Sequence, residues 1–418
     1  MAQIKAKMRS ALVGAALVLA ADAAPAASLN ILYSFTGGLD GGYPNGPLVR
    51  DAEGKLFGTT SAGGEATGYG FGVAYRLAPT ASGQWQETVL HRFANRPSNS
   101  PPTSALTLDL RGALYGSAYG AGAGGYVFRL APRPVGGYRY TTLFSFPGIF
   151  SPQGAGPLGP LLLDASGDVI GTTQNGGRTS GTNPCICGAV YSLAPTTQSG
   201  GWPETILYAF RHLNDSSNPD SGVTPGPDGN YYGLASQGGT GPCLDGSGVT
   251  VVGCGTLFRL RPSGTIWIED VLYNFPHIPP SGPYVFGADG TLYGIDLPDI
   301  VRLAPPKDGA GAWHREVIYQ FNGAVPGQPA GALVFDSAGN LYGGTFAATL
   351  TDSSVVFELS PSAGGGTSWT ATTLAVLDTG LSRTGPQGGL VRDPDGVLYG
   401  TVGFSSSSAH GYIFSVTP

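Results

Sequence analysis

The sequence predicts an all-β fold, a seven-bladed β-propeller with four antiparallel strands in each blade. Three observations lead to this prediction. One phrase, an apolar run followed by a Gly/Asp turn and a second run that ends in Gly, occurs seven times. The copies recur every 49 to 62 residues, a period typical of propeller blades. Each interval holds two further strand-like runs.

The phrase is clearest near the two ends of the chain, as GPLVRDAEGKLFGTT (46–60) and GGLVRDPDGVLYGTV (388–402). The other five copies are Ser104–Ala118, Gly159–Thr173, Ser221–Ala235, Gly282–Asp296 and Gly331–Thr345. The two further runs end in Pro, as in VAYRLAP (73–79), and in Phe, as in TVLHRF (88–93). The opening hairpin and these two runs give four strands in each unit.

The order of the runs predicts how the ring closes. The chain begins with a run of the fourth type, NILYSF (30–35), and ends with one of the third type, IFSVTP (413–418). We expect Asn30–Phe35 to pair with Ile413–Val416, which completes the last blade and removes an exposed sheet edge.

Residues 1–26 resemble a secretory signal peptide. Lys5, Lys7 and Arg9 precede the apolar run 11–21, and an A-x-A pattern follows at 24–26. No later apolar run is long enough to cross a bilayer. We therefore expect residues 27–418 to form the propeller, secreted or periplasmic and soluble after cleavage.

The composition excludes some partners. The formal net charge is −6, and removal of the leader with its three basic residues and Asp22 leaves about −8. Only 11% of residues are charged, and no basic patch or stripe of the kind that binds nucleic acid is evident. Gly (69) and Pro (34) recur at fixed offsets, so they indicate turns rather than disorder.

The repeated LYGTT…GG…G-x-VF-x-L pattern, as in Leu56–Thr60 followed by 73–77, resembles the GloVer tandem repeats of exported choice-of-anchor bacterial proteins. The resemblance covers essentially the whole chain after the leader. It implies an exported repeat protein and brings no particular chemistry or cofactor with it.

Cys185, Cys187, Cys243 and Cys254 occur only in the third and fourth units, between the second and third strands. Export favours disulfides. Pairing within each loop joins Cys185 to Cys187 and Cys243 to Cys254, the latter stabilising by about 3 kcal/mol. The alternatives are pairing across the two units, Cys187 with Cys243 or Cys185 with Cys254, and metal binding by the four thiols.

Two sets of repeated residues are assigned structural roles. The five tryptophans share one position in the repeat, five residues before the Leu or Ile of the fourth run, and Tyr138 takes this position in the second unit. Such periodic apolar positions indicate packing between blades. The turn aspartates suit tight hairpins and are poor catalytic candidates. They are Asp51, Asp109, Asp164, Asp336 and Asp393.

Binding residues are expected where the repeats differ. The loops after the second and fourth strands open on one face of a propeller and contain the variable segments 36–45, 94–103, 147–158, 174–187, 211–220, 236–255 and 276–281. Three aromatic residues on this face lie outside the repeat pattern, Tyr43, Tyr119 and Phe150. They are candidates for stacking on a sugar or a peptide.

Polar candidates lie on the same face. His212 and His277 each fall two residues after the repeated Phe, either as an acid–base or metal pair or, as we favour, as separate loop residues. Segment 214–220 around Asp215 is rich in oxygen ligands for Ca²⁺ but lacks the EF-hand spacing. The sequence therefore predicts no metal site and no cofactor, with Ca²⁺ the one alternative.

Two classes of function remain. The first is a secreted binding or scaffold module that takes a glycan or a protein on its loop face. The second is a propeller lyase or hydrolase using carboxylates such as Asp40, Asp215 or Asp296. An enzyme would require two such carboxylates, or His212 and a carboxylate, within about 5–10 Å of each other at the mouth of the central channel.

Overall fold

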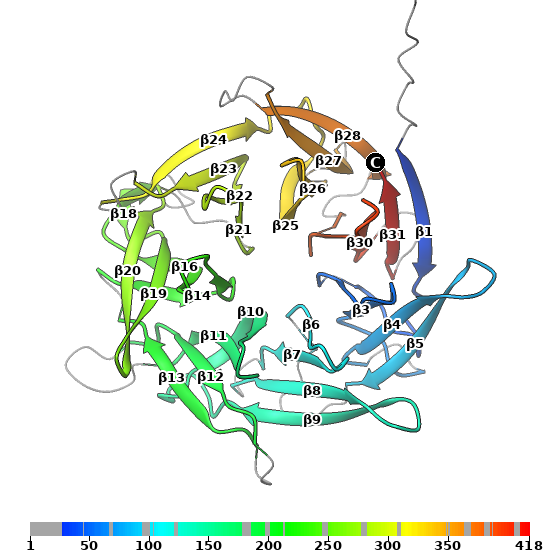
Figure 1. Cartoon of the computed structure of the whole chain (residues 1–418), viewed down its shortest axis with the longest axis horizontal. Helices are drawn as coiled ribbons and strands as arrows, with labels where there is room; N and C mark the ends of the chain where they lie inside the picture. Colours follow the sequence, from blue (N-terminus) through cyan, green and yellow to red (C-terminus); the bar gives the residue numbers. More distant parts are fainter. Residues whose placement is uncertain are drawn as a thin grey trace, which may run out of the picture.

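The seven predicted blades form a ring around a central axis (Figure 1). The computed structural model describes residues 27–418 except 45, 67–69, 94–100, 103, 121–123, 178–184, 197–200, 212–213, 245–249, 277–281, 307–310, 348, 350–351, 363–368, 380–384, 387 and 405–409. Within these residues all regular secondary structure consists of β-strands. The first strand of each blade faces the centre and the fourth lies outside. The predicted leader, 1–26, falls outside the described residues.

The strands follow the predicted order in the first three blades. Blade 1 contains β2 (Val49–Arg50), β3 (Leu56–Thr59), β4 (Val73–Pro79) and β5 (Trp85–Arg92). Blade 2 contains β6 (Thr107–Leu108), β7 (Leu114–Ala118), β8 (Tyr126–Pro132) and β9 (Tyr138–Ser145). Blade 3 contains β10 (Ala155–Leu163), β11 (Val169–Asn175), β12 (Ala189–Leu193) and β13 (Glu204–Ala209).

Blade 4 has a divided inner strand, because β14 (Ser216–Pro219) and β15 (Thr224–Pro225) both pair with β16 (Tyr231–Gly238). It is completed by β19 (Thr256–Ser263) and β20 (Ile266–Asn274), and β17 (Pro242–Leu244) and β18 (Thr250–Val252) form a small extra hairpin. Blade 5 contains β21 (Val285–Phe286), β22 (Leu292–Asp296), β23 (Asp299–Ala304) and β24 (His314–Gln320). Blade 6 contains β25 (Gln328–Phe335), β26 (Leu341–Phe346), β27 (Ser353–Pro361) and β28 (Trp369–Thr379).

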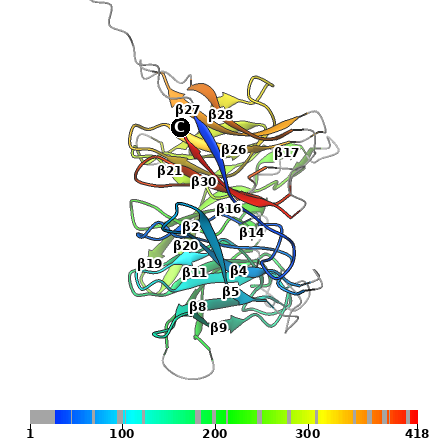
Figure 2. The same cartoon turned by 90° about the vertical axis from the view of Figure 1, so that its right-hand side faces the viewer.

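Blade 7 combines the two ends of the described chain. Its strands are β29 (Leu390–Arg392), β30 (Leu398–Val402), β31 (Tyr412–Thr417) and β1 (Ser28–Ser34). Strand β1 pairs antiparallel with β31, from Ser28 opposite Thr417 to Ser34 opposite Tyr412 (Figure 2). The first strand of the propeller is thus the outer strand of its last blade, and Phe35 is buried directly after it.

The recurring Gly of the second strand makes room for an aromatic ring of the third. A Cβ atom on Gly116 would lie 2.5 Å from Cζ of Phe128, closer than any real contact. The same relation joins Gly58 to Tyr75, Gly171 to Tyr191, Gly233 to Phe258, Gly343 to Phe357 and Gly400 to Phe414. The repeated Gly is therefore a packing requirement of each blade.

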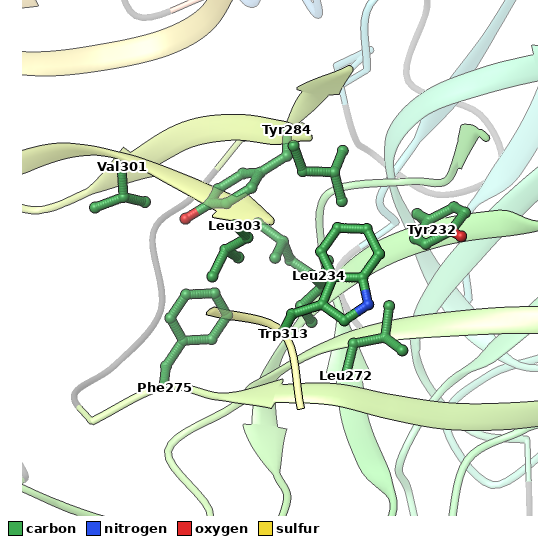
Figure 3. Packing of buried hydrophobic residues seen from close by; sticks show 10 residues of the cluster. Tyr232, Leu234, Leu272, Phe275, Tyr284, Val301, Leu303 and Trp313 are labelled. Atoms are coloured by element: carbon green, nitrogen blue, oxygen red, sulfur yellow. The ribbon is translucent and has the colours of Figure 1, made fainter. Parts of the chain in front are cut away.

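Blade 5 meets this requirement in another way. Its third strand carries Val301 in place of the aromatic residue. The ring against Gly294 comes instead from Tyr284, just before the inner strand, and a Cβ atom on Gly294 would lie 2.0 Å from its Cδ1 (Figure 3). In blade 5 the aromatic ring therefore comes from the residue before the first strand and not from the third strand, and the glycine is still needed.

The turn aspartates have the structural role that the sequence predicts. In blade 2, Oδ1 of Asp109 accepts hydrogen bonds from the backbone N–H groups of Arg111 and Ala113, both at 2.8 Å. The Tyr115 hydroxyl donates to Oδ2 at 3.3 Å. Similar bonds fix the turns at Asp51, Asp164, Asp336 and Asp393.

The tryptophans pack between blades, as predicted. Four rings contact the second-strand tyrosine of the preceding blade, with centroids 5.8–6.2 Å apart: Trp85 with Tyr399, Trp202 with Tyr115, Trp313 with Tyr232 (Figure 3) and Trp369 with Tyr293. Trp267 faces Ile170 at that position and stacks on Tyr231 of its own blade at 5.0 Å. Seven buried clusters, one at each junction between neighbouring blades, make up the core of the described residues.

Candidate functional site

The two faces of the propeller differ in their exposed apolar residues. We call the face with the loops after the second and fourth strands the loop face, and the face with the hairpin turns the turn face. Among the described residues, the large hydrophobic side chains exposed on the loop face are Leu39, Tyr43, Ile149, Phe150, Ile186, Leu297 and Phe404. The turn face exposes Leu110, Val135 and Ile266. The loop face is thus the richer in apolar contact groups.

Tyr43 is held in a fixed position on the loop face. Its backbone has φ = 57°, the left-handed region that costs a non-glycine residue about 1–3 kcal/mol. Two backbone hydrogen bonds maintain this conformation: the Tyr43 N–H donates to the carbonyl of His410 (2.8 Å) and the Ser61 N–H donates to the carbonyl of Tyr43 (3.2 Å). The side chain remains 37% exposed, so part of the phenol ring faces solvent from a fixed backbone position.

His410 forms the other side of this site, where blades 7 and 1 meet. Its ring lies edge-on to the Tyr43 ring, with centroids 5.8 Å apart. It also packs on Gly37, where a Cβ atom would lie 2.4 Å from Nδ1, and that buried nitrogen has no hydrogen-bond partner among the described residues. Leu39 and Phe404 are exposed in the same two loops. We call these four residues of the two loops, Leu39, Tyr43, Phe404 and His410, the seam patch; the side-chain contact that joins the loops is the one between the Tyr43 and His410 rings.

The other two aromatic candidates lie in different settings. Phe150 is 76% exposed in the loop between β9 and β10. Tyr119 is half-buried rather than exposed, because its hydroxyl donates to Oε1 of Gln174 (2.9 Å) and its ring packs on Gly156. Tyr119 thus joins blade 2 to blade 3, and it is less free to contact a ligand than the sequence suggested.

The candidate carboxylates Asp40 and Asp215 each bind a tyrosine from the outer strand that precedes them. The Tyr33 hydroxyl donates to Oδ2 of Asp40 at 3.0 Å. The Tyr208 hydroxyl lies 2.9 Å from Oδ2 of Asp215 and 3.3 Å from Oε2 of Glu269. Burial raises the pKa of Asp215 to about 6. Two carboxylates therefore do share one hydroxyl, but Tyr208 and Glu269 lie on outer strands, away from the central channel.

Asp296 is buried, although the sequence offers it as an accessible carboxylate for the enzyme hypothesis. Only 1% of its surface is accessible, because β22 and β23 are joined by a short turn at this point. Its Oδ2 forms an ion pair with Arg315 at 2.6 Å, and Asp299 lies 3.5 Å from the same guanidinium. Asp296 thus has a structural partner within blade 5.

The three carboxylates do not converge on one site. Asp40 precedes blade 1, Asp215 lies at the start of blade 4, and Asp296 belongs to blade 5. Each is held by contacts within or beside its own blade. The arrangement that the enzyme hypothesis required, two carboxylates at the mouth of the central channel, is not formed by these three.

The predicted metal ligands are only partly described. His212 and His277 lie outside the described residues. In segment 214–220, Ser216–Pro219 forms strand β14, and the Asn218 side chain donates to the carbonyl of Gln174 at 3.0 Å. Among the described residues, no group of three or more His, Cys, Asp or Glu side chains is placed to hold a metal ion. No helix in the described part of the chain is long and apolar enough to cross a membrane.

All four cysteines form disulfides, and both bonds are within single loops. Cys185 pairs with Cys187 and Cys243 with Cys254, which is the within-loop alternative. The Asn218 N–H donates to the carbonyl of Cys187 at 2.7 Å, so the first disulfide is attached to the start of blade 4. The two disulfides indicate an oxidising, extracytoplasmic setting.

Sequence reasoning missed two members of the seam patch. Neither His410, which lies in a Ser-rich loop, nor Phe404 is singled out by the sequence analysis. Neither can be connected to Tyr43 by spacing, since they come from opposite ends of the chain. Gly37 lies against the His410 ring, but Gly148 and Gly323 occupy the same place two residues after the repeated Phe, so this glycine does not indicate the contact from the sequence.

Comparisons with known proteins agree with the fold and the repeat. A family model described as Gloeobacter/Verrucomicrobia repeat matches residues 21–244. No curated protein matches the chain. Among solved structures, it is similar to virginiamycin B lyase from Staphylococcus aureus, with 14% identity, coverage of 94% of this chain and 99% of that chain, and a TM-score of 0.55.

A second solved structure, a putative 6-phosphogluconolactonase from Bacteroides uniformis, is 15% identical over 89% of this chain and 93% of that chain, with a TM-score of 0.47. At such identities the likeness to the lyase shows a shared fold and nothing about the reaction.

Proposed function

The chain belongs to the Gloeobacter/Verrucomicrobia repeat family, and we propose that this member is an exported binding propeller that takes a glycan or a protein on its loop face. The observation that carries the proposal is Tyr43. An exposed aromatic ring on a strained backbone, fixed by two hydrogen bonds, is a preorganised contact group. Strained positions of this kind concentrate at ligand sites.

The neighbours of Tyr43 support the same function. The seam patch combines an aromatic ring, an imidazole edge and two exposed apolar side chains, the mixture with which pockets and interfaces hold sugars and peptides. Phe150 adds a second aromatic contact on the same face. A rigid ring of blades holds these loops in place, so binding requires little ordering.

The experiment is a glycan-array and peptide-library screen with residues 27–418, followed by calorimetry on each ligand found. We expect Tyr43→Ala to weaken binding at least about tenfold, the effect of removing an aromatic anchor. Val376→Ala is the matched control, because Val376 is also exposed but lies on outer strand β28. A ligand that binds both variants as tightly as the parent would place the site elsewhere and refute the proposal.

Export is part of the proposal. The segment 1–26 has the layout of a signal peptide, and the two disulfides require an oxidising compartment to form. Expression with the native leader in a bacterial host, followed by N-terminal sequencing, tests it. A protein that starts near Ala27 and is recovered outside the cytoplasm is expected, and an uncleaved cytoplasmic protein would overturn this part.

One observation favours the alternative, a lyase or hydrolase. Asp215 and Glu269 share the Tyr208 hydroxyl, and a carboxyl group with a pKa near 6 beside a second carboxylate is suited to acid–base work. Turnover in a panel of polysaccharide and lactone substrates that is lost in Asp215→Asn, with an unchanged melting temperature, would favour the enzyme over the binding module.

A further inference from the structure

Blade 2 presents two aliphatic side chains to solvent on the turn face. Leu110 and Val135 are 108% and 98% exposed, the highest values among the exposed large hydrophobic residues of the described chain. Leu110 occupies the second position of the β6–β7 turn, where the other six blades have Ala, Ser or Pro. Val135 lies midway in the turn that joins β8 to β9. The repeat does not require either residue.

The two tips lie at the same end of one blade. The β6–β7 turn approaches the β8–β9 hairpin, since a Cβ atom on Gly112 would lie 3.8 Å from Cγ of Pro132. Backbone hydrogen bonds fix both tips, from Gly112 to Asp109 (3.0 Å) and from Arg133 to Gly137 (3.0 Å). The two aliphatic side chains therefore project from rigid hairpins and are not part of the core.

Three arginines lie close to these tips along the chain. Arg111 follows Leu110, Arg133 precedes Val135 by two residues, and Arg139 follows it in β9, and all three are exposed. None of the three forms an ion pair with another described residue. The nearby carboxylate of Asp109 accepts backbone hydrogen bonds within its own turn and forms an ion pair with Arg129 at 4.0 Å. The charges of the three arginines are therefore not neutralised locally.

The charge of this segment is opposite to that of the whole chain. From Thr107 to Ser145, the strands and turns of blade 2, the sequence has four arginines and one acidic residue, Asp109, although the chain carries a formal net charge of −6. A basic end of a blade with two exposed aliphatic side chains fits a bilayer surface, which has anionic headgroups outside and hydrocarbon chains beneath them. A soluble polyanion would use the arginines but would leave Leu110 and Val135 without a role.

We propose that the turn-face end of blade 2 docks on a bilayer rich in anionic phospholipid, with Leu110 and Val135 entering the headgroup–acyl boundary and Arg111, Arg133 and Arg139 contacting the phosphates. This surface lies on the face opposite the seam patch. A membrane-docked propeller would thus leave its loop face free for a ligand.

The test is co-sedimentation of residues 27–418 with vesicles of equal parts phosphatidylglycerol and phosphatidylcholine, compared with phosphatidylcholine alone. We expect binding to the anionic vesicles only, weakened by salt. The double variant Leu110→Ser/Val135→Ser should reduce partitioning at least about tenfold. Arg→Gln changes at the three arginines should each reduce it about fivefold.

Ile266→Ser is the matched control. Ile266 is a 61% exposed aliphatic residue at a turn-face hairpin of blade 4, where Arg259 and Arg261 both pair with Asp270 at 2.9 Å. This variant should bind vesicles like the parent.

Three results would overturn the proposal: equal binding to phosphatidylcholine alone, loss of binding in Ile266→Ser, or binding that survives the change at both tips. Tight binding to heparin or duplex DNA that depends on the arginines and not on the tips would identify a soluble polyanion as the partner instead. The substituted residues are all exposed, so unchanged melting temperatures should accompany each variant.

Discussion

The contact between the repeated glycine and the aromatic ring predicts a specific rescue. In blade 2, a Cβ atom on Gly116 would lie 2.5 Å from Cζ of Phe128 and 3.0 Å from Cδ2 of Leu106. Gly116 does not adopt a positive φ, so alanine fits the backbone and any loss of stability comes from overpacking. Overpacking of a close-packed core costs about 1–3 kcal/mol.

The double variant Gly116→Ala/Phe128→Leu should recover much of that cost, because the shorter side chain leaves room for the new methyl group. Phe128→Leu alone creates a cavity and costs about 1–3 kcal/mol. The two changes fill and vacate the same space, so the double variant should lose at least about 1 kcal/mol less than the sum of the single losses. Blade 5, with Val301 opposite Gly294, shows that a blade can be built with an aliphatic residue in the third strand.

The assay is chemical unfolding of the four proteins followed by fluorescence, with melting temperatures as a second measure. Gly46→Ala is the matched control, since its Cβ atom would meet nothing closer than 3.6 Å, and its stability should stay within about 0.5 kcal/mol of the parent. Strictly additive losses in the double variant would refute the reasoning, because they would show that the Phe128 ring is not what excludes a side chain at Gly116.

Three further predictions concern closure, titration and a buried ion pair. Deletion of residues 27–35 removes the partner of β31 and should lower the melting temperature or cause aggregation; a truncated protein as stable as the parent would contradict this. Burial raises the pKa of Glu87 from 4.5 to about 7, so its proton stabilises the fold at low pH and this stability is lost as pH rises from about 4.5 to 7. Glu87→Gln should therefore match the parent in melting temperature below pH 4.5 and exceed it above pH 7, and a constant difference would argue against the shift. Arg315→Ala leaves Asp296 buried and unpaired and should cost about 3–5 kcal/mol in unfolding free energy, whereas a loss below 1 kcal/mol would mean that the ion pair is dispensable.

The candidate site could be predicted from the sequence only in part. Tyr43 and Phe150 were recognisable because they depart from the repeat, and both are exposed on the predicted face. Asp296 was misplaced because its loop is shorter than those of the other blades, which brings Arg315 onto its carboxylate. Spacing along the chain does not show which side chains of different strands and blades are in contact, and these contacts decide whether a side chain such as that of Asp296 is buried.

The sequence by itself determined the number of blades, the strands in each and the order in which they occur. The same sequence motif occurs seven times, and its hydrophobic alternation, its turn residues and the glycine of its second strand each act on local structure. The tertiary structure decided what happens between blades and at the junction of the two chain ends. It brought His410 to Tyr43, gave Asp215 a carboxylate neighbour in Glu269, and brought the β6–β7 turn with Leu110 close to the β8–β9 hairpin with Val135. These contacts join residues of different strands and blades, and only the closed ring fixes the distances between them.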